Sequence, residues 1–226
     1  MNKFFDDFYN FGGFGPAVKS TPATKETLRF FEHKLPARLL EYWQEYGFCG
    51  WGQGIFWTVN PLDYTDILKE WLSGTPFEQR VIDGKDKYYV IGRGAFGKLI
   101  VWGETSGQSI DINVNFGMIF PTDDTENLKQ LGHERCIDLF YATNSKDYME
   151  EQDLNEKPLF ERALEKLGPL DADEMYGFVP ALALGGAPKL ENLQKVKVIE
   201  HLTFLADLGE KTVMADIVAM SDALHK

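Results

Sequence analysis

Three short strand-like segments follow one another at residues 87–91, 98–102 and 109–115, separated by six residues in each case. In the last of them Ile110, Ile112 and Val114 alternate with polar residues, which is the pattern of a half-buried strand. Connections this short suit antiparallel neighbours, because a parallel crossover needs about a dozen residues or more. We therefore predict an antiparallel meander with helices on one side.

Two helices are predicted before the meander. Over residues 35–47 the apolar residues follow helical spacing and Gly47 is a good terminator. Over residues 60–72 Asn60 can cap a helix that has Pro61 at its first position and one apolar stripe behind it. Residues 55–59 between them read as a short strand.

The chain changes composition near residues 121–143. All five tryptophans and 13 of the 17 phenylalanines lie before residue 121. The second half is more acidic, with helices predicted over 134–141, 158–167, 193–208 and 211–225 and an apolar, glycine-bounded segment at 177–186. We predict the α+β class, with an N-terminal antiparallel sheet and flanking helices (domain 1–125) and a mainly helical α+β C-terminal domain (126–226) packed against it.

The chain is acidic, with 35 acidic and 23 basic residues and a net charge of -12. Such a field repels nucleic acid and anionic membranes and speeds encounter with basic partners, although solubility alone could also explain it. Cys49 and Cys136 lie far apart without metal-type spacing, which suits a reducing compartment. With no signal-peptide pattern and no apolar run of about 18 residues, we expect a cytoplasmic protein.

One motif imitates a nucleotide site. Residues 92–97 read G-x-G-x-x-G, but a strand follows them, whereas a dinucleotide loop opens a helix. A kinase glycine-rich loop would fit between strands, yet the kinase H-R-D and D-F-G motifs are missing. We interpret the motif as a hairpin turn and keep a small nucleotide-binding protein or enzyme as the alternative.

The histidine and cysteine residues do not form a recognisable active site. His133 and Cys136 could share a helix face, but two ligands do not make a zinc site. Neither cysteine has the setting of an activated nucleophile. We predict no catalytic residue, no metal and no cofactor, and hence a binding protein rather than an enzyme.

The acidic residues supply the candidate contacts. Residues 147–174 hold ten acidic and three basic residues, so this stretch is our first choice for meeting a basic partner, although a solvated surface is the default interpretation. Trp51, in a glycine-flanked loop, is the tryptophan we most expect to be exposed; a small-molecule sensor with a pocket beside it is a further alternative. The candidate partner-binding residues are Trp51, Asp123, Asp124, Asp147, Glu150, Glu151, Asp153, Asp171, Asp173 and Glu174.

Two parts of the chain resemble known bacterial families. Residues 54–61, with Trp43, Gly47 and Gly50 before them, and residues 91–97 and 117–121 are similar to the GAD-like domain. Residues 176–186, 190–193 and 200–202 are similar to the companion domain that commonly follows it. Proteins with this arrangement include immunity partners of type VI secretion DNase effectors.

The resemblance implies an immunity protein. Such a protein would bind a cognate secreted toxin, a basic nuclease domain, and block its active site, without binding nucleic acid or membranes itself. The family has no catalytic motif to carry over. The oligomeric state and the contact residues stay open.

Overall fold

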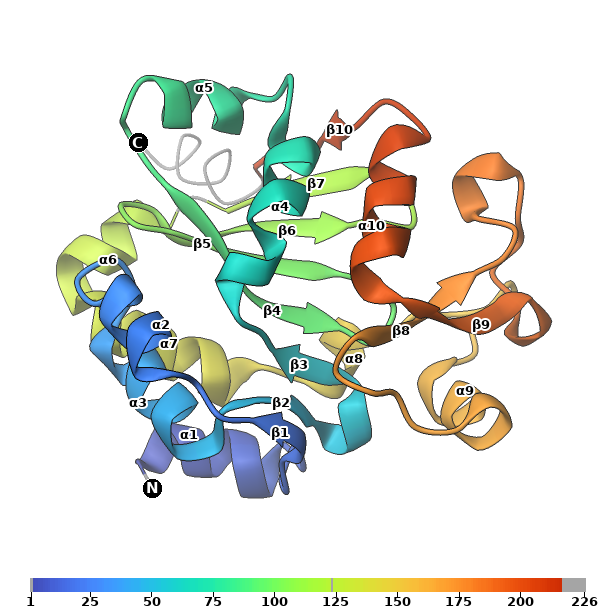
Figure 1. The fold of residues 1–226 in the computed structure, drawn as a ribbon, viewed down its shortest axis with the longest axis horizontal. Coiled ribbons are helices and arrows are strands. Elements are labelled where there is room, and N and C mark those ends of the chain that lie inside the picture. Colours follow the sequence, from blue (N-terminus) through green and yellow to red (C-terminus); the bar gives the residue numbers. More distant parts are fainter. Residues whose placement is uncertain (1, 123, 217–226) are drawn as a thin grey trace, which may run out of the picture.

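The computed structural model describes residues 2–122 and 124–216, and its centre is an eight-stranded sheet (Figure 1). The strand order is β1-β2-β3-β4-β5-β6-β7-β10. The strands are β1 (Val18–Thr21), β2 (Phe48–Trp51), β3 (Phe56–Thr58), β4 (Tyr88–Gly94), β5 (Leu99–Gly103), β6 (Gly107–Asn113), β7 (Met118–Pro121) and β10 (Thr212–Val213). The predicted α+β class and the meander of β4, β5 and β6 are confirmed.

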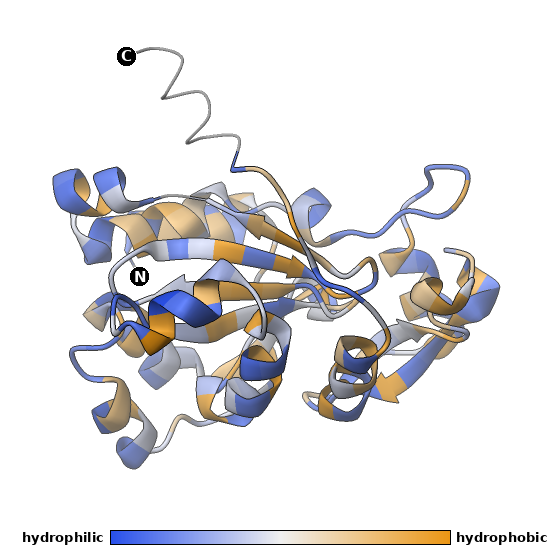
Figure 2. Cartoon of the chain, turned by 90° about the horizontal axis from the view of Figure 1, so that it is seen from above, coloured by the Kyte–Doolittle hydropathy of each residue, from blue (hydrophilic) through white to orange (hydrophobic). Residues whose placement is uncertain are grey.

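Helices cover both faces of this sheet, so the expectation of helices on one side is wrong. All of β5 is buried, and because side chains alternate along a strand, both faces must be covered. Figure 2 shows helices on both sides of the strands. The helices are α1 (Lys3–Asp6), α2 (Lys25–Phe31), α3 (Ala37–Tyr46), α4 (Thr65–Leu72), α5 (Pro76–Ile82), α6 (Thr125–Leu131), α7 (His133–Thr143), α8 (Lys146–Met149), α9 (Phe160–Leu167) and α10 (Val198–Asp207). None of these helices is long and apolar enough to cross a bilayer, within the residues described.

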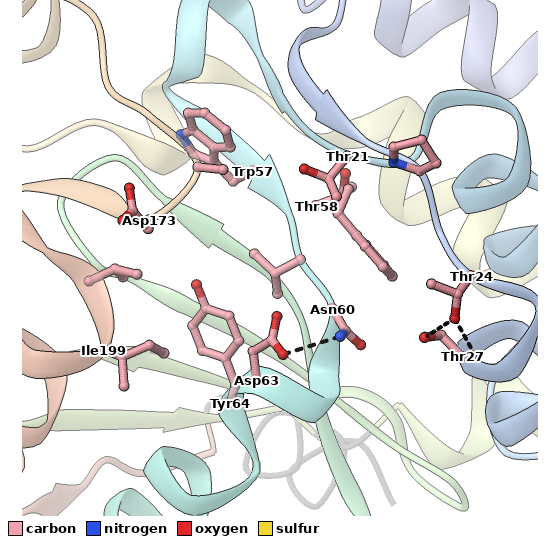
Figure 3. A pocket seen from close by; sticks show the side chains of 15 residues that line it. Thr21, Thr24, Thr27, Trp57, Thr58, Asn60, Asp63, Tyr64, Asp173 and Ile199 are labelled. Atoms are coloured by element: carbon pink, nitrogen blue, oxygen red, sulfur yellow. Dashed lines mark hydrogen bonds between the residues drawn. The ribbon is translucent and has the colours of Figure 1, made fainter.

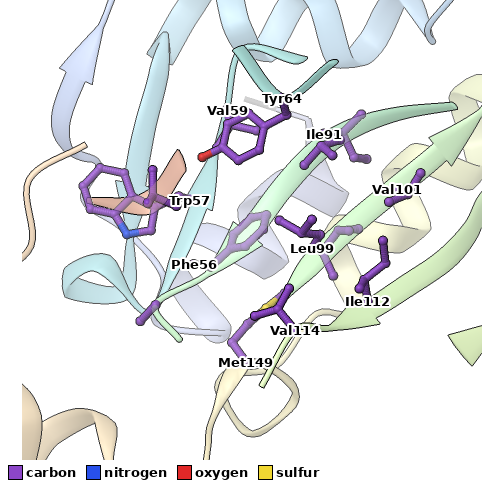
Figure 4. Close-up of a cluster of buried hydrophobic side chains, with 14 of the residues drawn as sticks. Phe56, Trp57, Val59, Tyr64, Ile91, Leu99, Val101, Ile112, Val114 and Met149 are labelled. Atoms are coloured by element: carbon purple, nitrogen blue, oxygen red, sulfur yellow. The ribbon is translucent and has the colours of Figure 1, made fainter. Parts of the chain in front are cut away.

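The helix starts follow the signals in the sequence. The Asn60 side chain accepts a hydrogen bond from the Leu62 amide, and the 3-10 turn η3 (Pro61–Tyr64) leads into α4. Helix α4 then buries Ile67, Leu68 and Trp71. On the sheet face beneath it, Leu99, Val101 and Ile112 from neighbouring strands form a continuous apolar layer with Tyr64 and Val59 (Figure 4).

Trp51 is buried, which corrects the expectation that it is exposed. It ends β2, is 1% exposed, and its indole donates to the Thr58 hydroxyl at 3.3 Å. The aromatic N-terminal segment covers it: the ring centroids of Phe5 and Phe8 lie 5.6 and 5.4 Å from that of Trp51. A small-molecule site beside an exposed Trp51 therefore has no support.

The C-terminal lobe, residues 150–209, consists of α9, α10 and a two-stranded sheet. Strand β8 (Glu174–Phe178) pairs antiparallel with β9 (Leu193–Lys197). A helix is predicted over residues 193–208, but residues 193–197 form strand β9. The helix α10 begins only at Val198. The helix predicted over 211–225 is wrong at its start, where Thr212 and Val213 pair with β7 in parallel, and its residues from 217 lie outside the described part.

The C-terminal lobe lies beside the sheet, with α10 against α4 (Figure 1). The backbone amide of Tyr176 in β8 donates to the carbonyl of Ala95, after β4, at 2.9 Å. Helix α7 follows the predicted domain boundary at residue 125. It packs on α1 and α3, which belong to the N-terminal part of the chain that forms the large sheet. The boundary itself stays a prediction.

Candidate functional site

Three backbone amides of the glycine motif at residues 92–97 are already hydrogen bonded within the chain. Gly92 to Gly94 complete β4, and the Gly94, Ala95 and Gly97 amides donate to the carbonyls of Lys98, Ile55 and Gly94 at 2.8, 2.8 and 3.1 Å. Ala95 and Phe96 are buried. A phosphate-binding loop needs N–H groups directed at the ligand, so the geometry favours a hairpin turn over a nucleotide site.

Arg93, in the middle of this motif, joins the sheet to the C-terminal lobe. Its side chain is completely buried, and its Nη2 donates to the carbonyls of Ala172 and Glu174, both at 2.9 Å. The guanidinium lies 4.9 Å from the centroid of the Trp57 ring. Burial lowers the pKa of Arg93, and the neighbouring Tyr64 raises it. Backbone carbonyls thus replace part of the water that this cation loses on folding, while its Nε has no partner among the described residues.

A cavity of about 400 Å³ opens at the same junction. Its walls come from the start of α2, from β2, β3 and η3, and from residues 172–173 and the start of α10 in the C-terminal lobe. Figure 3 shows Asp173 and Ile199 on one side, Thr21, Thr24 and Thr27 on the other, and Asp63 and Asn60 between them. Both parts of the chain are therefore needed to form it.

The lining of the cavity is apolar inside and acidic at its edge. Trp57, Val59 and Tyr64 are buried, while Asp63 and Asp173 are exposed; no lysine or arginine is among the residues that line it. The Asp63 carboxylate accepts a hydrogen bond from the Asn60 side-chain Nδ2 at 3.2 Å (Figure 3). A cavity of this size with an apolar lining and a few polar groups is suited to binding.

Several of the predicted acidic residues are already paired with cations of the same chain. Asp171, Asp173 and Glu174 pair with Lys19, Lys197 and Lys195 at 2.8, 2.5 and 3.1 Å. Asp153 pairs with Arg162 at 2.7 Å. Asp124 accepts from Asn127, Asp147 is exposed in the first turn of α8, and Asp123 lies outside the described residues.

Glu150 has a structural role that its sequence context does not reveal. Its Oε1 accepts from the amides of Glu151, Leu159 and Phe160 at 3.0, 3.1 and 2.9 Å, which caps the start of α9. Of the predicted partner-binding residues, Asp173 is the one that lines the cavity. Contact of the others with a partner stays a prediction. The cavity residues Asp63, Tyr64 and Ile199 were missed, because they come from two elements that are far apart in the sequence.

A group of half-buried charged residues lies on the sheet around Lys98. The Lys98 Nζ donates to the backbone carbonyl of Tyr148 at 2.8 Å. It also lies 3.4 Å from the centroid of the Tyr148 ring. Burial raises the pKa of Asp111 to about 6, against the opposing effects of Lys98 and a hydrogen bond from Gln108. Burial also raises the pKa of Glu151. The lysine thus faces carboxylates that folding has made less acidic.

The raised pKa of Asp111 makes the stability of the fold depend on pH. Its folded pKa of about 6 is above the ordinary value of 3.8, so its contribution to stability is complete below about pH 4 and is lost as the pH rises through 6. Above pH 6 we expect Asp111→Asn to have a free energy of unfolding about 1–3 kcal/mol higher than that of the wild type. Near pH 4 the two proteins should be equally stable. Urea titrations at pH 4, 5, 6 and 8 would measure it.

Asp83 is the control, because its pKa is shifted in the opposite direction to that of Asp111. The Lys85 side chain lowers the pKa of the Asp83 carboxyl through a hydrogen bond at 2.7 Å. Asp83→Asn should therefore give no gain in stability at any pH. An Asp111→Asn protein that is no more stable than the wild type at pH 8 would contradict the assignment of Asp111 as a half-buried carboxylate that destabilises the fold.

Metal binding has no support in the described residues. Within 2–122 and 124–216, no group of three or more histidine, cysteine, aspartate or glutamate side chains is placed to hold a metal ion. Cys136 is buried and free, and the His133 ring lies 6.2 Å from that of Trp102. Cys136 packs in the interior, whereas His133 is exposed at the start of α7.

Comparisons with known proteins match both parts of the chain. A family profile described as the GAD-like domain matches residues 4–116, and one described as the C-terminal part of the T6SS immunity protein Tdi1 matches residues 135–209. The crystal structure of Atu4351 from Agrobacterium tumefaciens has the same fold, with a TM-score of 0.80 at 21% identity, over 94% of this chain and 91% of that chain. No curated protein matches.

Proposed function

Since the chain belongs to the GAD-like domain family, we propose that it is an immunity protein that binds and neutralises a cognate type VI secretion toxin. The observation that carries the proposal is the match of residues 135–209 to the C-terminal domain of a T6SS immunity protein. This family suggests a binding protein rather than an enzyme. The toxin partner follows from the same match.

We further propose that the toxin is a DNase and that the protein occludes its active site. A DNA-cleaving domain needs a basic surface to bind phosphates, and a chain with a net charge of -12 is complementary to such a surface. Association should then be fast and sensitive to salt. The acidic edge of the cavity between the sheet and the C-terminal lobe supports the same partner chemistry.

The test is co-expression with the product of the neighbouring gene. We expect the two proteins to co-purify, the complex to leave plasmid DNA intact, and the toxin freed from the complex to cleave it. If the two proteins do not bind, the immunity role is wrong. If they bind but the freed toxin leaves DNA intact, the nuclease assignment is wrong and the immunity role stands.

The glycine motif allows a matching check of the nucleotide-binding alternative. Because its Gly94, Ala95 and Gly97 amides are already hydrogen bonded, we expect no heat of binding when ATP or NAD is titrated into the protein. Measurable binding that Gly94→Val abolishes would favour the alternative.

A further inference from the structure

We propose that the cavity between the sheet and the C-terminal lobe is the socket that receives an apolar side chain from a basic segment of the toxin. The inference rests on the proposed immunity function and adds to it the location and chemistry of the central contact. The cavity holds about 400 Å³, at the small end of the range of about 300–1,000 Å³ typical of binding pockets. That space fits one or two side chains of a partner.

The interior of the cavity has the character of an interface hot spot. Trp57 and Tyr64 present aromatic surface, and Val59 and Val198 present aliphatic surface, all from buried positions. Ile199 forms an exposed lip, with 36% of its surface accessible. Residues that dominate binding energy insert into such preformed, dry pockets and are surrounded by polar contacts that exclude water.

The edge of the cavity selects a basic partner. Asp63 and Asp173 line it, and Glu200 follows Ile199 directly in the first turn of α10. Among the described residues, no cation lies within ion-pair distance of Asp63. Asp173 pairs with Lys197, but both side chains are more than half exposed, and such surface pairs are weak enough to be exchanged for a partner's cation.

The buried Arg93 decides which part of the toxin goes inside. Its guanidinium contacts the Trp57 ring, and its charge acts on Tyr64, so it lies directly behind the cavity wall. A second cation at the bottom of the cavity would be repelled in this low-dielectric setting. The apolar side chain therefore occupies the interior, and the lysine or arginine residues beside it stay at the edge with Asp63 and Asp173.

Another apolar groove on the surface does not have this charge pattern. It holds about 230 Å³ between α4, α5 and β4, and its charged residues are Lys69, Lys87 and Glu78. Two cations and one carboxylate do not complement a basic segment. Charge complementarity therefore favours the cavity at the lobe junction.

The experiment uses exposed residues at the edge, so that the fold is preserved. Asp63→Lys reverses the charge there, and Ile199→Trp places a large side chain across the opening. Asp66→Lys and Thr203→Trp are the matched controls, because they make the same changes at exposed positions of α4 and α10 that do not line the cavity. Thermal unfolding of all four proteins checks that they fold.

The affinity of each variant for the purified product of the neighbouring gene is measured by titration calorimetry. We expect Asp63→Lys and Ile199→Trp to weaken binding at least about tenfold, and the controls to stay within about threefold of the wild type. If the wild type binds and all four variants bind equally well, the socket is wrong while the immunity function stands. If the wild type does not bind, the proposed function fails first. Self-association of the wild type that Ile199→Trp abolishes would assign the cavity to a second copy of the chain and overturn the proposal.

Discussion

Replacing Arg93 with methionine will lower the free energy of unfolding by about 3–5 kcal/mol, because it leaves buried polar groups without partners. The carbonyls of Ala172 and Glu174 lose the donor that lies 2.9 Å from each of them. Methionine matches the length of the arginine stem, so the loss reports the guanidinium and not a large void. Urea unfolding followed by the fluorescence of the five buried tryptophans measures it.

Lys195→Met is the control for the loss of a cation at the same lobe. Lys195 pairs with Glu174 at 3.1 Å, but about a third of its side chain is exposed. Water can therefore solvate the carboxylate when the lysine is removed, and the unfolding midpoint should move far less than in Arg93→Met. Equal midpoints for Arg93→Met and the wild type would show that Arg93 does not hold the two parts together.

Gly97→Ala is expected to lower stability by about 2 kcal/mol or more, whereas Gly94→Ala is expected to be neutral or slightly stabilising. Gly97 has φ +92°, and a methyl group there would lie 2.6 Å from Met175 Cε and 2.8 Å from Val114 Cγ2. A methyl group on Gly94 would meet Lys98 and Met149 at ordinary distances of 3.4 and 3.6 Å. Thermal unfolding of the two variants side by side measures the difference.

This pair of variants also separates the two interpretations of the glycine motif. A nucleotide loop needs its glycines for close approach of the backbone to phosphate, so both substitutions would then reduce ligand binding and neither need change stability. A packing role predicts a loss of stability at Gly97 alone. A Gly97→Ala protein as stable as Gly94→Ala would contradict the packing role.

Much of the sheet and its first helices follows from local sequence. The strands between residues 87 and 115 have short connections and strong β patterns, and the Asn60 cap starts the η3–α4 segment where predicted. These features depend on residues a few positions apart. The helix predicted over 193–208 failed at its start because residues 193–197 pair with β8, about 20 positions earlier, which local periodicity does not report.

The candidate site was harder to predict, because its residues meet only in the folded chain. Trp51 has glycine neighbours, as exposed loop residues often do, yet Phe5 and Phe8 from the N-terminal segment bury it. Arg93 reads as part of a turn, and its acceptors lie 79 and 81 positions further along the chain. The acidic stretch looks available in the sequence, but Lys19 of β1 and Lys197 of β9, the neighbour of β8, pair with Asp171 and Asp173.

Strand β10 has a consequence for how such proteins diversify. Thr212 and Val213 return from the C-terminal lobe to pair with Met118 and Ile119 of β7, so the lobe is inserted between two segments of the sheet unit. Replacing the lobe by that of a relative therefore takes two junctions in the chain, one before residue 150 and one after residue 209, where an appended domain would take one. An exchanged lobe would also have to keep the backbone carbonyls at residues 172 and 174 within reach of Arg93.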